Sequence, residues 1–292
     1  MPELPEVETV MRGLAPVLVG RRIAHVDIRR EGLRFPFPTD FAGRLLDRKI
    51  IGLTRRAKYI LVTLDDTQIF LVHLGMTGRF TIAGEKMKAL GEFYHPSQTA
   101  DTGVGTHDHV VISLDDGTRV IYTDPRRFGI MDMLHDNERS THKLLKDIGV
   151  EPLGNGFNGV YLAEKFTDKK TPLKAALLDQ RIIAGLGNIY VSEALHRTGL
   201  SPKRKAGTLA RKAEQLDSLA RHIRDILNEA IRAGGSTLQD FASTNGQEGS
   251  YQQRFAVYDR ANEPCQRPGC GGTIHRIVQS GRSTFYCKQC QK

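Results

Sequence analysis

Hydrophobic residues near the start of the chain recur at the spacing of one helix face. They are Val7, Val10, Met11, Leu14 and Leu18, with polar or small residues between most of them. This spacing predicts an amphipathic helix whose apolar side packs on a core, and Gly20 is expected to end it.

After residue 20 the pattern changes to short apolar runs of strand length. Such runs cover residues 22–28, 49–54, 59–64, 69–74, 79–82, 110–114 and 120–122. The last two flank Asp115, Asp116 and Gly117, which predict a hairpin turn. Strands at this spacing are typical of an antiparallel sandwich or barrel, with the N-terminal helix packed on it. Residues 84–106 have little periodicity and are expected to form an inserted loop.

From about residue 140 the pattern is helical. Short amphipathic helices are expected at 171–180 and 189–197, on either side of a tight glycine-rich turn at 185–188. The sequence therefore predicts an α+β protein in which an antiparallel sandwich or barrel precedes a helical part.

A longer helix follows, with one apolar stripe from Leu209 to Ile231, and it is expected to close at Gly234 and Gly235. Residues 236–260 are rich in Gly, Ser, Gln and Asn and are expected to form a mobile loop or linker.

Composition and net charge indicate the class of protein and the kind of partner that it binds. The 292 residues, 39 % hydrophobic and 26 % charged, are those of an ordinary globular protein with two or more domains. No apolar run approaches the roughly 20 residues of a membrane span and no signal peptide is evident, so we expect a cytoplasmic or nucleoid-associated protein. The formal net charge of +9 favours polyanionic partners, although many basic proteins bind no nucleic acid.

The cysteines are Cys265, Cys270, Cys287 and Cys290, all close to the C-terminus. Two pairs separated by a spacer of this length match a tetrahedral four-thiolate zinc site. Two disulfides are the alternative, which the missing secretion signal disfavours. His275 could also be a ligand, but four cysteines leave it no vacancy. Because four protein ligands leave no open coordination position, we expect one structural Zn²⁺.

The first candidate for catalytic chemistry is Pro2. If the initiator methionine is removed, Pro2 exposes a secondary amine with a pKa near ~8, so that a useful fraction is neutral at neutral pH. A neutral amine can attack a carbon atom and form an imine. Glu3, Glu6 and Glu8 are near enough in the chain to transfer protons for it. The alternative is that Pro2 and Pro5 only stiffen the first turn of the helix.

Two short segments have the composition of DNA-reading tips. Residues 124–129 (Asp-Pro-Arg-Arg-Phe-Gly) follow a predicted strand; arginine can hydrogen-bond a base edge, and phenylalanine can wedge between bases. Residues 73–78 (His-Leu-Gly-Met-Thr-Gly) carry a flexible methionine that could fill a gap in a base stack. Ordinary turns with a partly buried Met76 or Phe128 are the alternative. Together the two segments predict a device that distorts duplex DNA.

Three further positions could bind phosphate. The turn at 185–188 exposes backbone N–H groups at a helix start, to which Asn188 could add a donor. Lys58, before a predicted strand, could hold a phosphate or a leaving base. Arg282, near an expected hairpin tip, could contact the DNA backbone. The alternatives are a glycine-packed helical hairpin around Asn188 and a solvated strand end at Lys58.

These motifs together resemble the formamidopyrimidine-DNA glycosylase family, bacterial 8-oxoguanine DNA glycosylases with an abasic-site lyase activity. The resemblance covers essentially the whole chain. It rests on the Pro-Glu-Leu-Pro-Glu-Val-Glu start, the Arg-Arg-Ala-Lys-Tyr stretch at 55–59, the segments at 73–78 and 124–129, the Gly-Leu-Gly-Asn-Ile-Tyr turn at 185–190 and the terminal cysteines.

The resemblance implies a base-excision-repair enzyme that removes 8-oxoguanine and formamidopyrimidines from damaged double-stranded DNA and cleaves the abasic site by β,δ-elimination. The related endonuclease VIII branch, which prefers oxidised pyrimidines, usually has Gly where this chain has Leu4. Leu4 therefore indicates purine lesions.

The resemblance also implies residue roles. Pro2 is expected to attack C1′ as the Schiff-base nucleophile, and Glu3 to shuttle a proton at the sugar. Glu6 is expected to support the active site, and Lys58 to contact phosphate and assist base release. The implied DNA-binding residues are His107, Met76, Arg126, Phe128, Asn188 and Arg282. Of these, Met76, Arg126 and Phe128 would fill the gap left by a flipped base.

The expected domains are a catalytic β-sandwich with its N-terminal helix at 1–136, a helix–two-turn–helix domain at 137–260, and a zinc finger at 261–292. The lesion-covering loop is expected within residues 236–256 of the second domain. We expect a monomer without membrane contact. A non-catalytic DNA-binding protein and a zinc-stabilised enzyme with incidental charge are the competing functions. A pure DNA binder has no need of Pro2, Glu3 and Lys58 together, which favours the repair enzyme.

Overall fold

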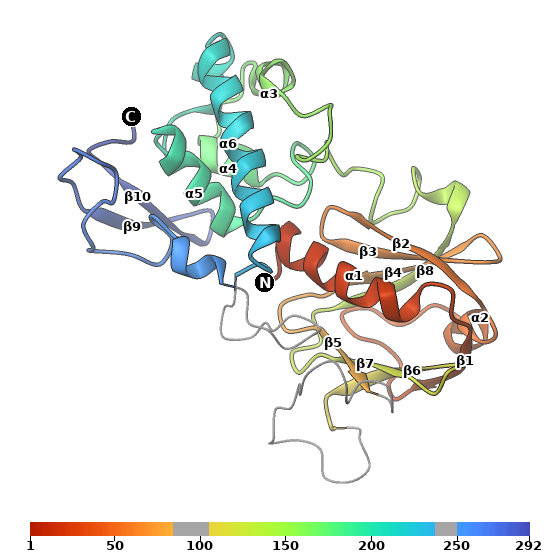
Figure 1. Cartoon of the computed structure of the whole chain (residues 1–292). Helices are drawn as coiled ribbons and strands as arrows, with labels where there is room; N and C mark the ends of the chain where they lie inside the picture. Colours follow the sequence, from red (N-terminus) through yellow and green to blue (C-terminus); the bar gives the residue numbers. More distant parts are fainter. Residues whose placement is uncertain (84–104, 237–249) are drawn as a thin grey trace. The chain divides into compact units, whose positions relative to one another are not determined.

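The computed structural model describes residues 1–83, 105–236 and 250–292 (Figure 1). Most of the inserted loop expected at 84–106, and the larger part of the expected lesion-covering loop, lie outside the described residues. The chain divides into two compact units: the first contains residues 1–146 and the segment from Gly234, and the second contains residues 147–233 and 250–292. The three-domain division expected from the sequence stays a prediction.

The first unit contains two four-stranded antiparallel sheets, as the spacing of the apolar runs predicts. One consists, in spatial order, of β2 (Ile50–Arg56), β3 (Tyr59–Leu64), β4 (Gln68–His73) and β8 (Ile130–His135). The other consists of β1 (Ile23–Ile28), β6 (Asp108–Leu114), β7 (Arg119–Thr123) and β5 (Arg79–Ala83). One continuous apolar core takes side chains from both, such as Phe70 and Val72 from the first sheet and Ile112 and Val120 from the second. The predicted β-sandwich is therefore confirmed.

Helix α1 (Leu4–Leu18) contributes its predicted stripe to the same core. Val7, Val10 and Leu14 are each 1 % exposed. Pro5 lies in the first turn, where its missing N–H costs no helical hydrogen bond. The helix ends as predicted, and Gly20 takes a left-handed conformation with φ +86° just beyond it.

Strand β8 and helix α2 (Phe41–Leu45) of the first unit were not predicted from the sequence. Strand β8 reads Ile-Met-Asp-Met-Leu-His; its methionines are not typical of strands, so the run did not stand out. Helix α2 is five residues long and too short to show a helical period.

The second unit is helical before its C-terminal hairpin. It contains α3 (Gly159–Phe166), α4 (Leu173–Leu178), α5 (Asn188–Thr198), the 3₁₀ turn η3 (Ala206–Leu209) and α6 (Ala213–Arg232). Helix α3 was not predicted. Helix α4 is shorter than expected because Pro172 and Asp179 at its two ends have extended backbone. No helix of the described segments is long and apolar enough to cross a membrane.

The long predicted stripe is wrong at its start. Leu209 belongs to η3, and Lys212 leaves helical geometry (φ −114°, ψ 70°) before α6 begins. From Leu216 onward the stripe is correct, because Leu216, Ile223 and Leu227 are fully buried. Gly234 and Gly235 follow the helix with positive φ, as the predicted closing glycines.

The segment from residue 250 to residue 260 is packed, which corrects the mobile linker expected there. Tyr251, in the 3₁₀ turn η4 (Tyr251–Arg254), is 1 % exposed and Val257 is 0 % exposed. The buried Glu193 carboxylate of α5 accepts hydrogen bonds from the backbone N–H groups of residues 256–258 at 2.8–3.0 Å. The polar composition of the segment conceals these anchors.

Candidate active site and nucleic-acid interface

The N-terminus buries the candidate nucleophile together with two carboxylates. Pro2 is buried, whereas Met1 is 44 % exposed. Glu3 and Glu6 are 3 % and 2 % exposed. The Glu3 backbone N–H donates to Glu6 Oε2 at 2.9 Å, so Glu6 fixes the backbone directly after Pro2.

Glu6 also reaches a distant segment. Its Oε1 accepts from the backbone N–H of Ser236 at 2.9 Å and from the Ser236 hydroxyl at 3.0 Å. Gly235 (φ +84°) makes this approach possible, because an added Cβ would lie 3.1 Å from Glu6 Oε1. Ser236 was not singled out from the sequence, where the paired glycines before it were the available signal of a close backbone approach.

Lys58 lies in the tight turn between β2 and β3, after Ala57 in a left-handed conformation (φ 52°). It is 7 % exposed, so the alternative of a solvated strand end is wrong. The nearby Arg55 pairs with Glu8 of α1 at 2.8 Å. This ion pair holds the β2–β3 turn to the helix that begins beside Pro2.

The pKa of His73, at the end of β4, is shifted by its surroundings in this region. Burial, together with the positive charges of Lys58 and Arg34, lowers its pKa to about 4. The imidazole is therefore neutral at neutral pH. Its Nδ1 accepts the Gly75 backbone N–H at 3.0 Å, which fixes the start of the turn that carries Met76.

The two predicted DNA-reading tips lie next to each other. Met76 is half-buried in the turn after β4, and Phe128 is 43 % exposed in the loop after β7. The Arg126 guanidinium lies over the Phe128 ring at 5.0 Å, a cation–π contact. The Arg126 backbone N–H donates to the Thr77 hydroxyl at 3.3 Å, which joins the two segments. His107 is exposed just before β6.

In the second unit, Asn188 and Arg282 come from separate elements that meet. Asn188 is the first residue of α5, and Arg282 is the exposed first residue of β10 (Arg282–Cys287), which pairs with β9 (Ile274–Gln279). The Asn188 Nδ2 donates to the Ser283 carbonyl at 3.0 Å. Lys174, which is 1 % exposed and was not singled out from the sequence, donates to the same carbonyl at 2.8 Å.

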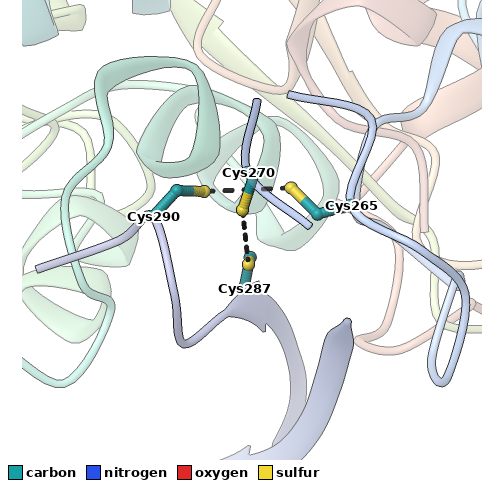
Figure 2. A group of neighbouring side chains, drawn as sticks. All are labelled: Cys265, Cys270, Cys287 and Cys290. Carbon is teal, nitrogen blue, oxygen red and sulfur yellow. Dashed lines mark hydrogen bonds between the residues drawn. The ribbon is translucent and has the colours of Figure 1, made fainter. Parts of the chain in front are cut away.

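The four cysteines form the metal site that their spacing predicts (Figure 2). All four Sγ atoms lie within 4.8 Å of one another, and the cysteines are free thiols, so two disulfides are excluded. Sulfur ligands about 2.3 Å from zinc at tetrahedral corners lie about 3.8 Å apart. The Cys265–Cys290 and Cys270–Cys287 distances of 3.8 and 3.5 Å fit that geometry.

A histidine contacts this site, but it is not His275. The His196 Nε2 of α5 lies 3.3 Å from Cys265 Sγ. Burial, with the charges of Arg267 and Arg197, lowers the pKa of His196 to about 4. A neutral imidazole can donate one hydrogen bond to a ligand sulfur without competing for the metal. The ring of His275 packs toward Tyr286 instead.

Three family models match the chain in order. They are the formamidopyrimidine-DNA glycosylase N-terminal domain at residues 1–131, its H2TH domain at 148–242, and the zinc finger found in FPG and IleRS at 262–292. The formamidopyrimidine-DNA glycosylase of Beijerinckia indica is 55 % identical and that of Rhizobium johnstonii is 54 % identical, each over all of both chains.

Solved structures agree with these matches. The crystal structure of MutM (Fpg) from Thermus thermophilus has a TM-score of 0.82 at 36 % identity and covers 99 % of this chain and 98 % of its own. A complex of Lactococcus lactis Fpg with abasic-site DNA has a TM-score of 0.83 at 31 % identity and covers 99 % of each chain. The sandwich, the H2TH domain and the zinc finger thus recur together, and this chain belongs to the formamidopyrimidine-DNA glycosylase family.

Proposed function

We propose that this protein is a base-excision-repair DNA glycosylase and abasic-site lyase that removes 8-oxoguanine and formamidopyrimidines from duplex DNA. The full-length match to relatives of that name at 55 % identity carries the proposal. Related structures hold DNA that contains carbocyclic 8-oxo-G, a Fapy-dG lesion or an abasic site. The buried Pro2 and its carboxylates supply a chemistry that suits this reaction.

Pro2 is the proposed nucleophile once Met1 is removed. A base within the duplex must first be flipped out before an amine can reach its sugar. The neutral amine of Pro2 then forms a bond to C1′, the glycosidic bond breaks, and the base leaves with the bonding electrons and takes up the proton that the Pro2 nitrogen loses. Glu3 delivers a proton to the sugar ring oxygen as the ring opens to the iminium.

The iminium makes the C2′ proton acidic. Loss of that proton breaks the C3′–O bond, and loss of a C4′ proton then breaks the C5′–O bond, so that both phosphates leave. Water finally releases the sugar fragment from Pro2. Glu6 keeps the Glu3 backbone in place through its 2.9 Å hydrogen bond, and the buried Lys58 adds positive charge for the phosphate or the leaving base.

The remaining residues act on the duplex. Met76, Arg126 and Phe128 occupy the space that the flipped base leaves, because an empty stack would otherwise collapse. Asn188, Arg282 and His107 contact the DNA backbone. The four-cysteine site holds one Zn²⁺, which shapes the β9–β10 hairpin that carries Arg282. Because the substrate is chromosomal DNA, we infer a cytoplasmic, nucleoid-associated protein, and we expect it to act as a monomer.

Borohydride trapping tests this function. The mature protein, with loss of Met1 verified by mass, is incubated with a duplex containing 8-oxoguanine and reduced. We expect a covalent protein–DNA complex, because reduction fixes the imine to Pro2. A panel of lesion duplexes then ranks the substrates. Absence of a trapped species with every lesion, while the protein still binds the duplexes, would favour the non-catalytic DNA-binding protein.

A further inference from the structure

A buried carboxylate lies beneath the two DNA-reading tips. Asp124 is 0 % exposed, and it lies among Thr77, His109 and Tyr122, which are 7 %, 2 % and 0 % exposed. Burying a charged carboxylate costs several kcal/mol unless hydrogen bonds replace the lost water. Such a group in a small sandwich therefore calls for a structural or functional reason.

Each oxygen of the Asp124 carboxylate accepts a hydrogen bond from one of the two tips. Its Oδ1 accepts from the Thr77 hydroxyl at 2.5 Å, in the turn that carries Met76. Its Oδ2 accepts the Gly129 backbone N–H at 2.8 Å, at the end of its own loop. A charged acceptor makes such bonds shorter and stronger than neutral ones.

Thr77 completes the connection. Its hydroxyl donates to Asp124 and accepts the Arg126 backbone N–H at 3.3 Å. One hydroxyl therefore holds both the base of the loop and the residue that carries the exposed guanidinium. Loss of this hydroxyl would leave a buried acceptor and a backbone donor without their partner.

The surroundings make this connection rigid. The Asp124 carbonyl accepts from the Arg127 backbone N–H at 3.2 Å and is 2.9 Å from His109 Nε2. The Tyr122 hydroxyl approaches the carboxylate at 3.4 Å. Burial, together with the Asp124 charge, raises the pKa of Tyr122 well above its usual range, so it stays a donor.

We propose that Thr77 and Asp124 are positioning residues that hold Met76 and the Arg126–Phe128 pair as one preformed wedge for the gap in the base stack. This inference rests on the proposed function. A wedge that is already rigid loses little conformational entropy when it enters DNA. A wedge in two independent loops would have to be ordered during base flipping, and extrusion of the lesion would become slower.

Thr77→Val tests the proposal, because valine keeps the shape of threonine and removes the hydroxyl. Thr77→Ser restores a hydroxyl, and Thr81→Val makes the same change at an exposed position of β5. Each full-length, zinc-loaded protein is compared in three measurements. These are single-turnover excision of 8-oxoguanine from a duplex, borohydride trapping on a single-stranded abasic oligonucleotide, and fluorescence of 2-aminopurine beside the lesion, which reports unstacking.

We expect Thr77→Val to slow duplex excision about 10- to 100-fold, the effect of misplacing a positioning group by about 1 Å. The 2-aminopurine response should shrink with it. Trapping on the single strand should stay within about twofold of wild type, because that substrate has no partner strand to wedge apart. Thr77→Ser should recover most of the excision rate, and Thr81→Val should match wild type.

Two results would overturn the proposal. In the first, Thr77→Val has the same excision rate and the same 2-aminopurine response as Thr81→Val. In the second, Thr77→Val loses single-strand trapping in proportion to its loss of duplex excision. If Thr77→Val does not fold, Thr77→Ala removes the hydroxyl without adding atoms, and the same three measurements apply. Failure of the proposed function is a separate result, since the wild-type protein would then neither trap nor excise.

Discussion

One carboxylate oxygen of Glu6 accepts both the backbone N–H and the hydroxyl of Ser236, at 2.9 and 3.0 Å. The other oxygen accepts the Glu3 backbone N–H at 2.9 Å. The start of α1, where the proposed nucleophile lies, is thereby fastened to a segment 230 residues further along. A single buried acid thus connects two distant parts of the first unit.

Glu6→Gln should break this connection. An amide presents an NH₂ group to one of the donors that the carboxylate satisfies, so one buried contact becomes repulsive. We expect unfolding in urea to require about 1–3 kcal/mol less free energy, with excision slowed by the displaced backbone. Ser236→Ala removes only the hydroxyl contact and should cost about 0.5–1.5 kcal/mol. Equal stability of Glu6→Gln and wild type would contradict the role assigned to this carboxylate.

Retention of Met1 should abolish covalent trapping. An amide nitrogen at Pro2 has no available lone pair for attack, whereas a free amine does. Protein made under inhibition of methionine removal, verified by mass, should bind a duplex with a non-cleavable abasic analogue yet form no borohydride-stable complex. Pro2→Gly keeps a terminal amine and should lose less activity than the Met1-retained form. Equal trapping with and without Met1 would contradict the assignment of Pro2.

Zinc removal should weaken DNA binding without destroying the sandwich. Cys287 is 0 % exposed, and Cys287→Ser removes one of four ligands from a site that shapes the β9–β10 hairpin. We expect lost zinc, measured by metal analysis, and a large loss of affinity. Arg282→Ala should keep its zinc and weaken binding by the same factor for all DNA sequences. It should also reduce the magnitude of the slope of log affinity against log salt concentration by about one. Unchanged zinc and affinity in Cys287→Ser would refute the structural role.

His73 should make stability fall in mild acid. Its pKa is 6.5 in the reference state and about 4 in the folded protein. Between these values the unfolded chain binds a proton that the folded chain does not, so its contribution is complete above pH 6.5 and declines as the pH falls toward 4. The whole difference corresponds to ~3 kcal/mol.

His73→Asn keeps an acceptor for the Gly75 N–H and removes the titration. Urea unfolding at about pH 7.5, 6 and 5 should therefore give a flatter decline than in wild type. His25→Asn, at an exposed position of β1, is the matched control and should leave the decline unchanged. The same slope in His73→Asn and wild type would show that this imidazole does not titrate as its burial demands.

Local signals in the sequence were enough to find the sandwich, α1 and the cysteine site. Apolar period, closing glycines and ligand spacing are properties of short segments, and for α1, the predicted strands and the four cysteines the structure agrees with them. Contacts between segments that are far apart in the chain could not be predicted from the sequence. Ser236 meets Glu6, and Thr77 meets Asp124, only because the chain folds, and no spacing rule connects residues 47 or 230 positions apart.

Gly75→Ala should separate backbone strain from a close contact between the tips. Gly75 (φ +67°) and Gly117 (φ +84°) both have left-handed backbone, so alanine costs about 1–2 kcal/mol of strain at either position. At Gly117 an added Cβ meets nothing within 4 Å, whereas at Gly75 it would collide with the backbone of Phe128 and Gly129. Gly117→Ala should therefore lower stability by the strain alone and leave excision unchanged. Gly75→Ala should cost more in urea unfolding and slow excision, because the collision pushes the two tips apart. If the two variants lose equal stability and excise alike, the tips are not packed as closely as their backbones indicate.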